Sequence, residues 1–311
     1  MKIAVVPYHP QWPEIFAKEA ARIKLALGEN CVEIHHVGST AISGISAKPI
    51  IDMIPVVKDI VKVDATENAM IKLGYDAKGE AGMLFRRFFT KSDADISFNI
   101  HVYEADAGEV DRLLKFRDWM RSHPLDAQAY SDLKNELAIQ FVNERLHYTM
   151  GKENFVASID SKTGFAGCRI VKVLTDREWE AYHRIRKQEI FDLMGVEYDI
   201  NHPGLTDKSR DNLVLYKGSA IVGVAQLEYL DANEVALRPY AIDAPYQQQG
   251  LGKIFLTAIE KWLNQQGRHI IRLHAYPKAV KFYEKLGYSP MPFPDKGRSF
   301  DFECVDMGKE I

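Results

Sequence analysis

Two glycines separated by one residue stand directly before an amphipathic segment in the second half of the chain. The stretch AIDAPYQQQGLGK covers residues 241–253, and apolar positions then recur at helical spacing in IFLTAIEKWLNQQG. Glycine lets the backbone approach an anion closely, and the first turn of a helix offers unpaired N–H groups and the positive end of its dipole. The spacing differs from the GxxxxGK[ST] and GxGxxG motifs of nucleotide sites. The start of this helix could therefore bind a phosphate-bearing ligand, and plain turn and helix-cap chemistry is the alternative for two such glycines.

A second group of polar residues lies in the first half. The stretch HHVGSTAISG (35–44) contains a Gly-Ser turn, and KPIID (48–52) ends in one carboxylate at the start of an apolar run. Such a group could bind a phosphate and a metal ion, or it could form a pocket in which Lys and Arg bind an anionic or nucleotide-like ligand in place of metal charge. The residues of this predicted N-terminal pocket are His36, Ser39, Thr40, Lys48, Asp52, Arg86, Arg87 and His101.

Both groups depend on strands and helices that the apolar pattern predicts. In the first half, helices are expected over 12–27, 65–74 and 109–159, and strands over 31–40, 48–57, 84–91 and 96–104. In the second half, strands are expected over 168–174, 212–218, 219–230, 234–243, 269–276 and near the C-terminus, and helices over 176–194, 250–266 and 278–286. The strand 48–57 is almost continuously apolar, which is typical of burial on both faces.

The tract SKTGFAGC (161–168) separates the two halves. It combines Ser, Lys, Thr and glycines without apolar periodicity, which is typical of a linker or a short loop. We therefore expect two domains, 1–162 and 168–311, both of the α/β (α+β) class, in a chain of 311 residues.

The composition excludes several classes of protein. Apolar residues make up 46% and charged residues 27% of the chain, as in soluble globular proteins, and the net charge of −3 is unlike that of a dedicated nucleic-acid binder. The cysteines at 31, 168 and 304 form no paired framework, which suits a reducing compartment. No signal-peptide or membrane-spanning run is present. We expect a cytoplasmic protein that binds neither nucleic acid nor membrane.

The second half also contains AVKFYEKLGY (279–288), downstream of the paired glycines. With the paired-glycine stretch (241–253) and this segment (279–288), the second half of the chain resembles the GCN5-related N-acetyltransferase (GNAT) family. Gln247, Gly250 and Gly252 match the family's [QR]xxGx[GA] pyrophosphate motif, and FYEKLGY (282–288) matches its closing segment. The resemblance implies a GNAT acyl-CoA acyltransferase fold with a splayed mixed sheet.

The resemblance further implies that acetyl-CoA binds at the paired glycines and along the strand before them. Backbone amides of the glycine turn would hold the pyrophosphate, and the strand would pair with the pantetheine. The cofactor-binding residues that it implies are Ala241, Ile242, Gln247, Gln249, Gly250, Leu251, Gly252, Lys253, Ala279 and Phe282.

The family chemistry assigns roles around the acceptor. A deprotonated amine attacks the thioester, a backbone amide near Ile242 holds the oxygen that gains charge, and Tyr283 is the phenol that protonates the departing thiolate. A purely structural core position is the alternative for Tyr283. Many relatives carry a general-base carboxylate at the position of Ala236, so the base must come from elsewhere. The candidates are Glu228, which we predict to be catalytic, Glu189, His202 and solvent water.

The strand that contains Pro239 is expected to bulge, because proline removes a donor from the ladder. In the GNAT family the corresponding strand parts from its neighbour and admits the cofactor. Side-chain alternation places Arg238 and Tyr240 on one face, and we predict that both contact the acceptor. Arg238 would bind a carboxylate or phosphate, and pairing with Glu228 or Glu234 across the sheet is the alternative.

The first half resembles the GrpB family, which has a nucleotidyltransferase-like fold. The matching segments are HVGSTAISGISAKPIID (36–52), IHVY (100–103), FRDWMRSHP (116–124), YSDLKNELA (130–138) and the pair Tyr148 and Lys152. The resemblance implies a mixed sheet with a helical C-terminal part. Nucleotidyl transfer typically needs two or three carboxylates that hold two metal ions, whereas Ile54 occupies the second place in DMI (52–54). We therefore expect no metal site.

The leading hypothesis is an N-acetyltransferase that transfers acetyl from acetyl-CoA to the amine of a small molecule or a protein, by direct attack in a ternary complex. The GrpB-like part would then be an accessory domain. One alternative is a CoA-binding sensor or scaffold without catalysis, which the alanine at position 236 suggests. The other is nucleotidyl or phosphoryl transfer by the first half.

Overall fold

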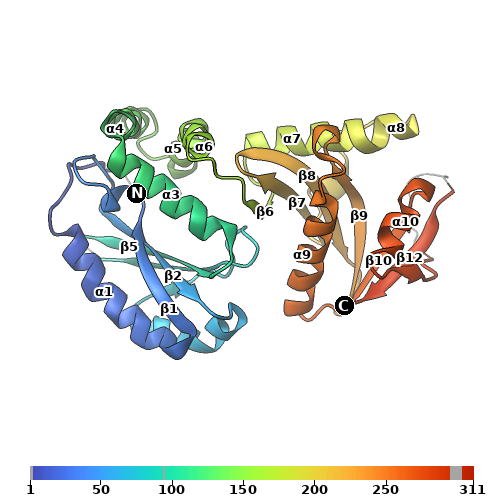
Figure 1. Cartoon of the computed structure of the whole chain (residues 1–311), viewed down its shortest axis with the longest axis horizontal. Coiled ribbons are helices and arrows are strands. Elements are labelled where there is room, and N and C mark those ends of the chain that lie inside the picture. Colours follow the sequence, from blue (N-terminus) through green and yellow to red (C-terminus); the bar gives the residue numbers. More distant parts are fainter. Residues whose placement is uncertain (1–2, 94, 295–302) are drawn as a thin grey trace. The chain divides into compact units, whose positions relative to one another are not determined.

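The computed structural model describes residues 3–93, 95–294 and 303–311 (Figure 1). The chain forms two compact units, one of Met1–Arg169 with Lys217–Ala220, and one of Ile170–Tyr216 with Ile221–Ile311. The predicted domain limits, 1–162 and 168–311, stay a prediction.

The N-terminal unit contains a five-stranded sheet in the order β1-β2-β5-β4-β3. Its strands are β1 (Cys31–Val37), β2 (Ile50–Val57), β3 (Asp76–Ala77), β4 (Arg87–Ser92) and β5 (Ser97–Glu104). Strand β2 runs antiparallel to β1 and parallel to β5. Its side chains from Met53 onward are all buried, which confirms the burial that its apolar sequence predicts.

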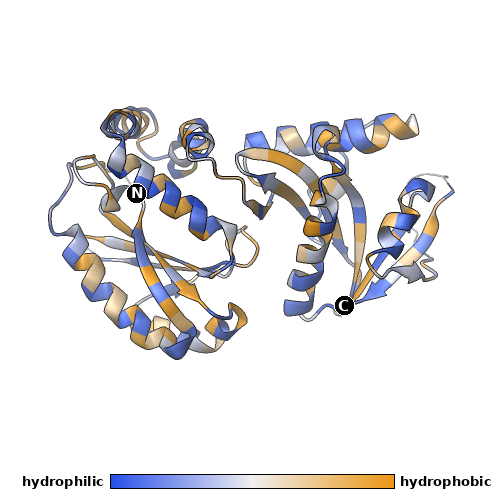
Figure 2. Cartoon of the chain, in the orientation of Figure 1, coloured by the Kyte–Doolittle hydropathy of each residue, from blue (hydrophilic) through white to orange (hydrophobic). Residues whose placement is uncertain are grey.

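Helices cover this sheet on both faces, as the alternation of its strands requires. They are α1 (Trp12–Leu27), α2 (Glu67–Lys72), α3 (Gly108–Ser122), α4 (Pro124–Gln140), α5 (Arg145–Met150) and α6 (Glu153–Lys162). Met53 packs with Ile23 of α1 in one hydrophobic cluster, whereas Ile54 packs with Val110 of α3 in another. Figure 2 shows the resulting pattern of hydrophobic strands and two-sided helices.

The sequence predictions for this unit need correction at their ends, among them the strand expected at 31–40, which ends at Val37. The helical region 109–159 is divided into four helices, α3 to α6, and the strand expected at 84–91 begins only at Arg87. The cause at the strand is a turn in which Phe85 has a φ of 63°, outside the extended region. The helix expected at 65–74 is preceded by a 3-10 turn, Val61–Thr66, and ends at Lys72.

The C-terminal unit is built on a seven-stranded mixed sheet in the order β11-β12-β10-β9-β8-β7-β6. The strands are β6 (Cys168–Lys172), β7 (Arg210–Lys217), β8 (Ala220–Tyr229), β9 (Glu234–Ile242), β10 (Ile270–Ala275), β11 (Ser289–Pro290) and β12 (Val305–Glu310). The helices are α7 (Asp176–Arg186), which continues through a π-helical turn (Lys187–Phe191) into α8 (Asp192–Met194), α9 (Leu251–Gln265) and α10 (Val280–Glu284).

Strand β9 bulges and then leaves its neighbour, as its proline predicts. In the ladder with β8, Leu237 pairs with Leu227 and Tyr240 pairs with Ala225, so β9 holds one extra residue at this point. The parallel ladder with β10 pairs β9 only as far as Ala236. The splayed mixed sheet expected of a GNAT fold is therefore confirmed (Figure 1).

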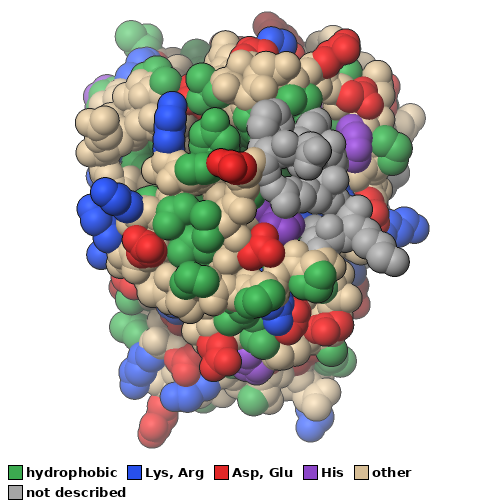
Figure 3. All heavy atoms as spheres, turned by 90° about the vertical axis from the view of Figure 1, so that its right-hand side faces the viewer, with side chains coloured by type: hydrophobic (Ala, Val, Ile, Leu, Met, Phe, Trp, Pro, Cys, Tyr) green, Lys and Arg blue, Asp and Glu red, His purple; other side chains and the backbone are tan. Residues whose placement is uncertain are grey.

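The surface carries both signs of charge. On the face in Figure 3, basic and acidic side chains lie interspersed, in keeping with the near balance of 40 basic and 43 acidic residues. Among the described residues, no helix has the length and apolar character needed to cross a bilayer.

Candidate functional site

Helix α9 begins without a side-chain cap. Its N-cap residue is Gly250, which has a φ of 78° in the left-handed region and provides no capping side chain. The amides of the first turn, including those of Leu251, Gly252 and Lys253, precede the first intrahelical N–H···O bond, which is donated by Ile254 to Gly250. This start of α9 therefore has the features that suit an anion.

The second glycine of the motif lies where the helix packs closely. A Cβ on Gly252 would lie 3.4 Å from the Phe282 ring and 3.7 Å from Cγ1 of Ile242. The start of α9 thus contacts both α10 and the end of β9. Three of the predicted cofactor-binding residues, Ile242, Gly252 and Phe282, are therefore brought together.

The glutamines of the motif support the turn itself. The Gln247 side-chain amide donates to the carbonyl of Ile242 at 2.8 Å and to the Glu189 carboxylate at 2.9 Å. The Gln249 side-chain amide donates to the carbonyl of Pro245 at 3.1 Å. Both glutamines therefore fix the backbone before α9, and their predicted contact with a cofactor stays a prediction.

Strand β9 presents a free edge beside this turn. Ala241 and Ile242 pair with Val224 and Gly223 of β8, whereas β10 pairs with β9 only at residues 234–236. Among the described strands, the other edge of β9 at Ala241 and Ile242 has no ladder partner. Such an edge can bind an extended ligand by backbone hydrogen bonds.

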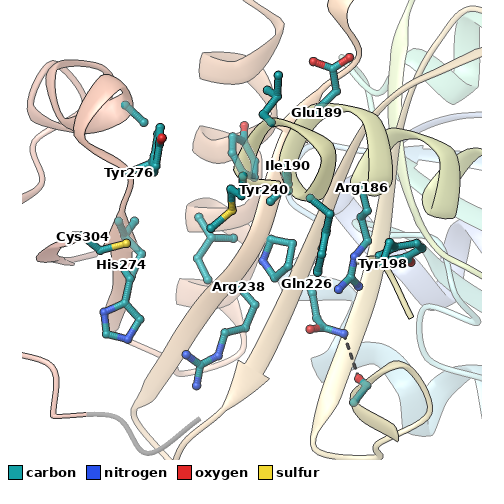
Figure 4. A pocket seen from close by; sticks show the side chains of 18 of the residues that line it. Arg186, Glu189, Ile190, Tyr198, Gln226, Arg238, Tyr240, His274, Tyr276 and Cys304 are labelled. Carbon is teal, nitrogen blue, oxygen red and sulfur yellow. Dashed lines mark hydrogen bonds between the residues drawn. The ribbon is translucent and has the colours of Figure 1, made fainter. Parts of the chain in front are cut away.

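A cavity of about 580 Å³ opens beside this edge (Figure 4). It is lined by residues of α7, the following turns, β8, β9, β10 and α10, among them the predicted residues Arg238, Tyr240, Ala279 and Tyr283. In Figure 4, Arg186, Tyr198 and Gln226 lie on one side, His274, Tyr276 and Cys304 lie on the other, and Arg238 and Tyr240 lie between them.

Tyr283 of α10 is 7% exposed and lines the cavity. Among the described residues its hydroxyl has no hydrogen-bond partner, although buried phenols usually have one. Burial raises the pKa of Tyr283, so the phenol keeps its proton at neutral pH. The side chain is therefore placed and protonated as a proton donor would be.

Tyr240 lines the cavity with its ring, but its hydroxyl is already engaged. The hydroxyl donates to the carbonyl of Gly252 at 2.5 Å, and the ring centroid lies 5.4 Å from that of Phe255 in α9. An acceptor can therefore contact the ring of Tyr240 while the hydroxyl fixes the first turn of α9.

Glu228 lies in a triad with two arginines. Its Oε2 accepts from Nε of Arg238 at 2.6 Å, and its Oε1 lies 3.1 Å from Nη2 of Arg210. The alternative that the sequence left open for Arg238, pairing with Glu228, is thus present in the structure. Each carboxylate oxygen of Glu228 thus faces one guanidinium, so a substrate would have to reach a remaining lone pair or displace one guanidinium before this side chain could accept a proton.

The other two candidate bases are also engaged. Glu189 accepts from the backbone N–H of Ala244 at 3.1 Å and from the Gln247 amide. Nδ1 of His202 accepts from the backbone N–H of Gly204 at 3.1 Å, which places the proton of the neutral ring on Nε2. Both side chains line the cavity. The lone pair of the His202 ring is engaged, whereas each Glu189 oxygen accepts one of these hydrogen bonds and keeps a second lone pair.

The N-terminal group centres on Asp52 of β2. The Asn99 amide donates to Oδ1 of Asp52 at 2.9 Å, and Nε2 of His101 lies 3.8 Å from the same oxygen. Burial raises the pKa of Asp52, but contact with His101 and Asn99 and the charge of Lys152 outweigh it, and the pKa is lowered. A Cβ on Gly38 would clash with Asp52, which explains the glycine of the Gly-Ser turn.

Other predicted pocket residues form hydrogen bonds or ion pairs with neighbouring protein groups. Nε2 of His36 lies 3.0 Å from the Thr40 hydroxyl, which donates to the carbonyl of Ile50. Burial lowers the pKa of His36 to about 4, so the ring is neutral at pH 7. Arg87 forms an ion pair with Asp64 at 2.5 Å. Ser39 belongs to a 3-10 turn with Thr40.

Two lysines meet near Asp52, and sequence reasoning missed the second as a pocket residue. Nζ of Lys48 and Nζ of Lys152 lie 4.5 Å and 4.8 Å from the centroid of the Tyr148 ring. Neither ammonium group has an ion pair with a described residue. Burial and then the charge of Lys48 lower the pKa of Lys152 to about 8. The pair Tyr148 and Lys152, which the sequence match to GrpB contained, was the available signal.

No group of three or more His, Cys, Asp or Glu side chains within the described ranges is arranged to hold a metal ion. The carboxylate that faces the two lysines is Asp52, with Asn99 and His101 beside it. The side chains gathered here are therefore better suited to bind an anion than to hold a pair of divalent metal ions.

Comparisons with known proteins match these two sets of features to two families. The family described as "GrpB protein" matches residues 2–162, and the "Acetyltransferase (GNAT) family" matches residues 171–288. Protein YqkA of Bacillus subtilis is 37% identical over 159 residues, which are 51% of this chain and 46% of that protein. The chain thus spans about half the length of this relative.

Two further proteins match along nearly their whole length. Glutamate-rich protein GrpB of Alkalihalophilus pseudofirmus is 30% identical over 163 residues, which are 51% of this chain and 94% of that protein. The crystal structure of the conserved protein GrpB from Enterococcus faecalis is 35% identical, covers 51% of this chain and 96% of its own, and has a TM-score of 0.50. The chain belongs to the GrpB family, and residues 171–288 in its C-terminal half match the model of the GNAT acetyltransferase family.

Proposed function

We propose that the C-terminal domain transfers acetyl from acetyl-CoA to an amine that binds in the cavity beside Tyr283. The observation that carries the proposal is the Tyr283 phenol, which lines the cavity without a hydrogen-bond partner among the described residues. The uncapped start of α9 and the free edge of β9 support a donor that carries both a pyrophosphate and an amide-rich arm.

In this proposal, different residues bind the donor, stabilise the reacting carbonyl oxygen and transfer the proton. Acetyl-CoA would supply an activated acetyl thioester. The backbone of Ala241 and Ile242 pairs with its arm, the amides from Gln249 to Lys253 hold its pyrophosphate, and Ala279 and Phe282 flank it. An amide near Ile242 stabilises the carbonyl oxygen as the amine adds and the carbon–sulfur bond breaks. Tyr283 gives its proton to the sulfur, and the proton lost by the amine restores the phenol.

The test combines binding and turnover. Calorimetry with CoA and acetyl-CoA should show binding, and a thiol-release assay over a panel of amines should show turnover. Binding without thiol release would support the alternative of a CoA sensor or scaffold. Absence of binding would remove the proposal altogether.

Glu228 is the predicted proton acceptor, and its two ion pairs make the role directly testable. If the acceptor displaces Arg238 or Arg210, Glu228→Gln should lower kcat/KM for the amine by roughly 10²-fold at neutral pH. The loss should shrink as the pH rises, because an amine that is already deprotonated needs no base. A constant ratio between mutant and wild type at every pH would show that Glu228 is structural, and the thermal midpoint of the variant would report a loss of folding.

We also propose that the N-terminal domain binds a nucleotide-like anion at Lys48 and Lys152. The two ammonium groups against Tyr148, with Asp52 as the acidic group acting on Lys152 among the described residues, support an excess of positive charge. Nucleotidyl transfer is the alternative, and it predicts pyrophosphate release from a nucleoside triphosphate with Mg²⁺. Binding of the triphosphate without such release supports a ligand pocket.

The binding should depend on pH with a definite sign. The pKa of Lys152 is lowered to about 8, so the ammonium group is charged below this pH and neutral above it. Affinity for ATP without Mg²⁺ should therefore fall as the pH rises through 8, by roughly tenfold for the loss of one charged hydrogen-bond donor. Lys152→Met should remove this pH dependence, whereas the exposed Lys72→Met should leave it unchanged. A pH dependence that persists in Lys152→Met would contradict the assignment.

A further inference from the structure

Arg186 at the end of α7 is a buried charge without an anionic partner. It is 6% exposed, and its Nη1 donates to the Tyr182 hydroxyl at 2.8 Å. Within the described residues it forms no ion pair, and its buried Nε has no hydrogen-bond partner. Nη2 of Arg186 also has no hydrogen-bond acceptor among the described residues. Arg186 lines the cavity of the proposed acetyltransferase site.

The surroundings of Arg186 stabilise a cation but do not neutralise it. The guanidinium carbon lies 5.0 Å from the Tyr182 ring centroid, 5.9 Å from that of Phe191 and 5.7 Å from that of Tyr198. Arginine does not lose its proton in proteins, and a buried ion costs several kcal/mol unless a counter-ion compensates it. A cage of aromatic rings leaves this compensation incomplete.

The other charged groups of the cavity do not supply the counter-ion. Glu228 is shared between Arg210 and Arg238, and Glu189 accepts from the backbone N–H of Ala244 and from the Gln247 amide. Glu197 and Asp199 also line the cavity, but both are exposed and neither lies within ion-pair distance of Arg186. The described residues thus leave Arg186 without a counter-ion, and an anion that enters the cavity would supply one.

The unpaired side of the Arg186 guanidinium indicates which anion fits. Nε and Nη2 form one side of the guanidinium plane, and a carboxylate accepts from these two atoms in a bidentate pair. One positive charge matches one carboxylate, whereas a phosphate dianion would need a second unpaired cation. The π-helical turn Lys187–Phe191 directly after Arg186 widens the helix here, and such turns are frequent at functional sites.

We propose that the acceptor is an amine that also carries a carboxylate, and that Arg186 binds this carboxylate in a bidentate pair. The inference rests on the proposed acetyl transfer, because it names the acceptor of that reaction. In Figure 4, Arg186 lies on the side of the cavity away from Tyr276, with Tyr240 between them. An amino acid bound at Arg186 would thus extend its amine toward the middle of the cavity.

Thiol release with L-amino acids and with their carboxamides tests the acceptor class, because each pair shares one amine and differs in one charge. The amino acids should have the lower KM. Arg186→Met should raise this KM by roughly 10- to 100-fold, the loss of a charged bidentate contact, and leave the KM for acetyl-CoA unchanged. Arg186→Lys should recover only part of the loss. Lys187→Met, which removes an exposed cation that pairs with the exposed Asp192, should behave as wild type.

The outcomes separate the two proposals. Equal turnover of amino acids and carboxamides, with no effect of Arg186→Met, overturns the carboxylate site and leaves acetyl transfer intact. If CoA binds but no amine releases thiol, acetyl transfer fails, and calorimetric titration of the amino acids into the CoA complex then tests Arg186 without turnover. Weaker binding in Arg186→Met supports the site, and equal binding contradicts it. Unchanged thermal midpoints show that the variants are folded.

Discussion

Tyr283→Phe is expected to lower kcat for thiol release by roughly 10²- to 10⁴-fold and to leave acetyl-CoA affinity unchanged. The substitution removes only a hydroxyl that has no hydrogen-bond partner among the described residues, so the fold should be retained. The loss follows because the leaving thiolate then has no proton donor at this position. Because burial raises the pKa of Tyr283, wild-type activity should show no loss of this acid between pH 6 and 9.

A second tyrosine of the same cavity provides the control. Tyr276 also lines the cavity but is 43% exposed, so Tyr276→Phe removes a hydroxyl that water can replace. We expect this variant to keep nearly full kcat. Equal rates in Tyr283→Phe and wild type would remove the phenol from the reaction and leave it a core side chain.

Gly250→Val is expected to weaken acetyl-CoA binding by about five- to 150-fold, because a β-branched residue at a φ of 78° carries a strain of order 1–3 kcal/mol. The chain can relieve this strain only by moving the turn that presents the first amides of α9. Calorimetry with CoA measures the effect directly. It should concern the donor alone and leave the KM for the amine nearly unchanged.

The matched variant is Gly250→Asn. Asparagine tolerates the left-handed region far better than valine, and a Cβ at this position would meet no atom within 4 Å. This variant should therefore keep most of the affinity for CoA. Equal, strong losses in both variants would mean that any side chain blocks the site, and equal, small losses would place the pyrophosphate elsewhere.

The fold could be predicted from the sequence wherever local pattern determines it. The apolar run of β2 indicated burial on two faces, and Pro239 indicated the bulge of β9, because both effects act within one strand. Element ends were less predictable. The turn before β4 depends on a positive φ at Phe85, and the sequence has no glycine at this position that would predict it.

The candidate site was predictable in its backbone and much less so in its polar contacts. The paired glycines located the start of α9, since turn geometry is encoded locally. The two arginines on Glu228 and the hydrogen bond from Tyr240 to Gly252 join segments distant in sequence, so no spacing rule contains them. Arg186 was missed for the opposite reason. Its importance lies in the partner that the described residues do not provide.

The one-sided pairing of β9 has a consequence for amide hydrogen exchange. From Tyr240 to Ile242, beyond the bulge and beyond Pro239, which has no N–H, successive backbone N–H groups face β8 and the open edge in turn, since β10 no longer pairs there. Deuterium should therefore enter this segment in an alternating pattern, with fast and slow amides next to each other. A ligand that completes the ladder would slow the fast amides and leave the slow ones unchanged, so the exchange profile would show which amides the ligand covers.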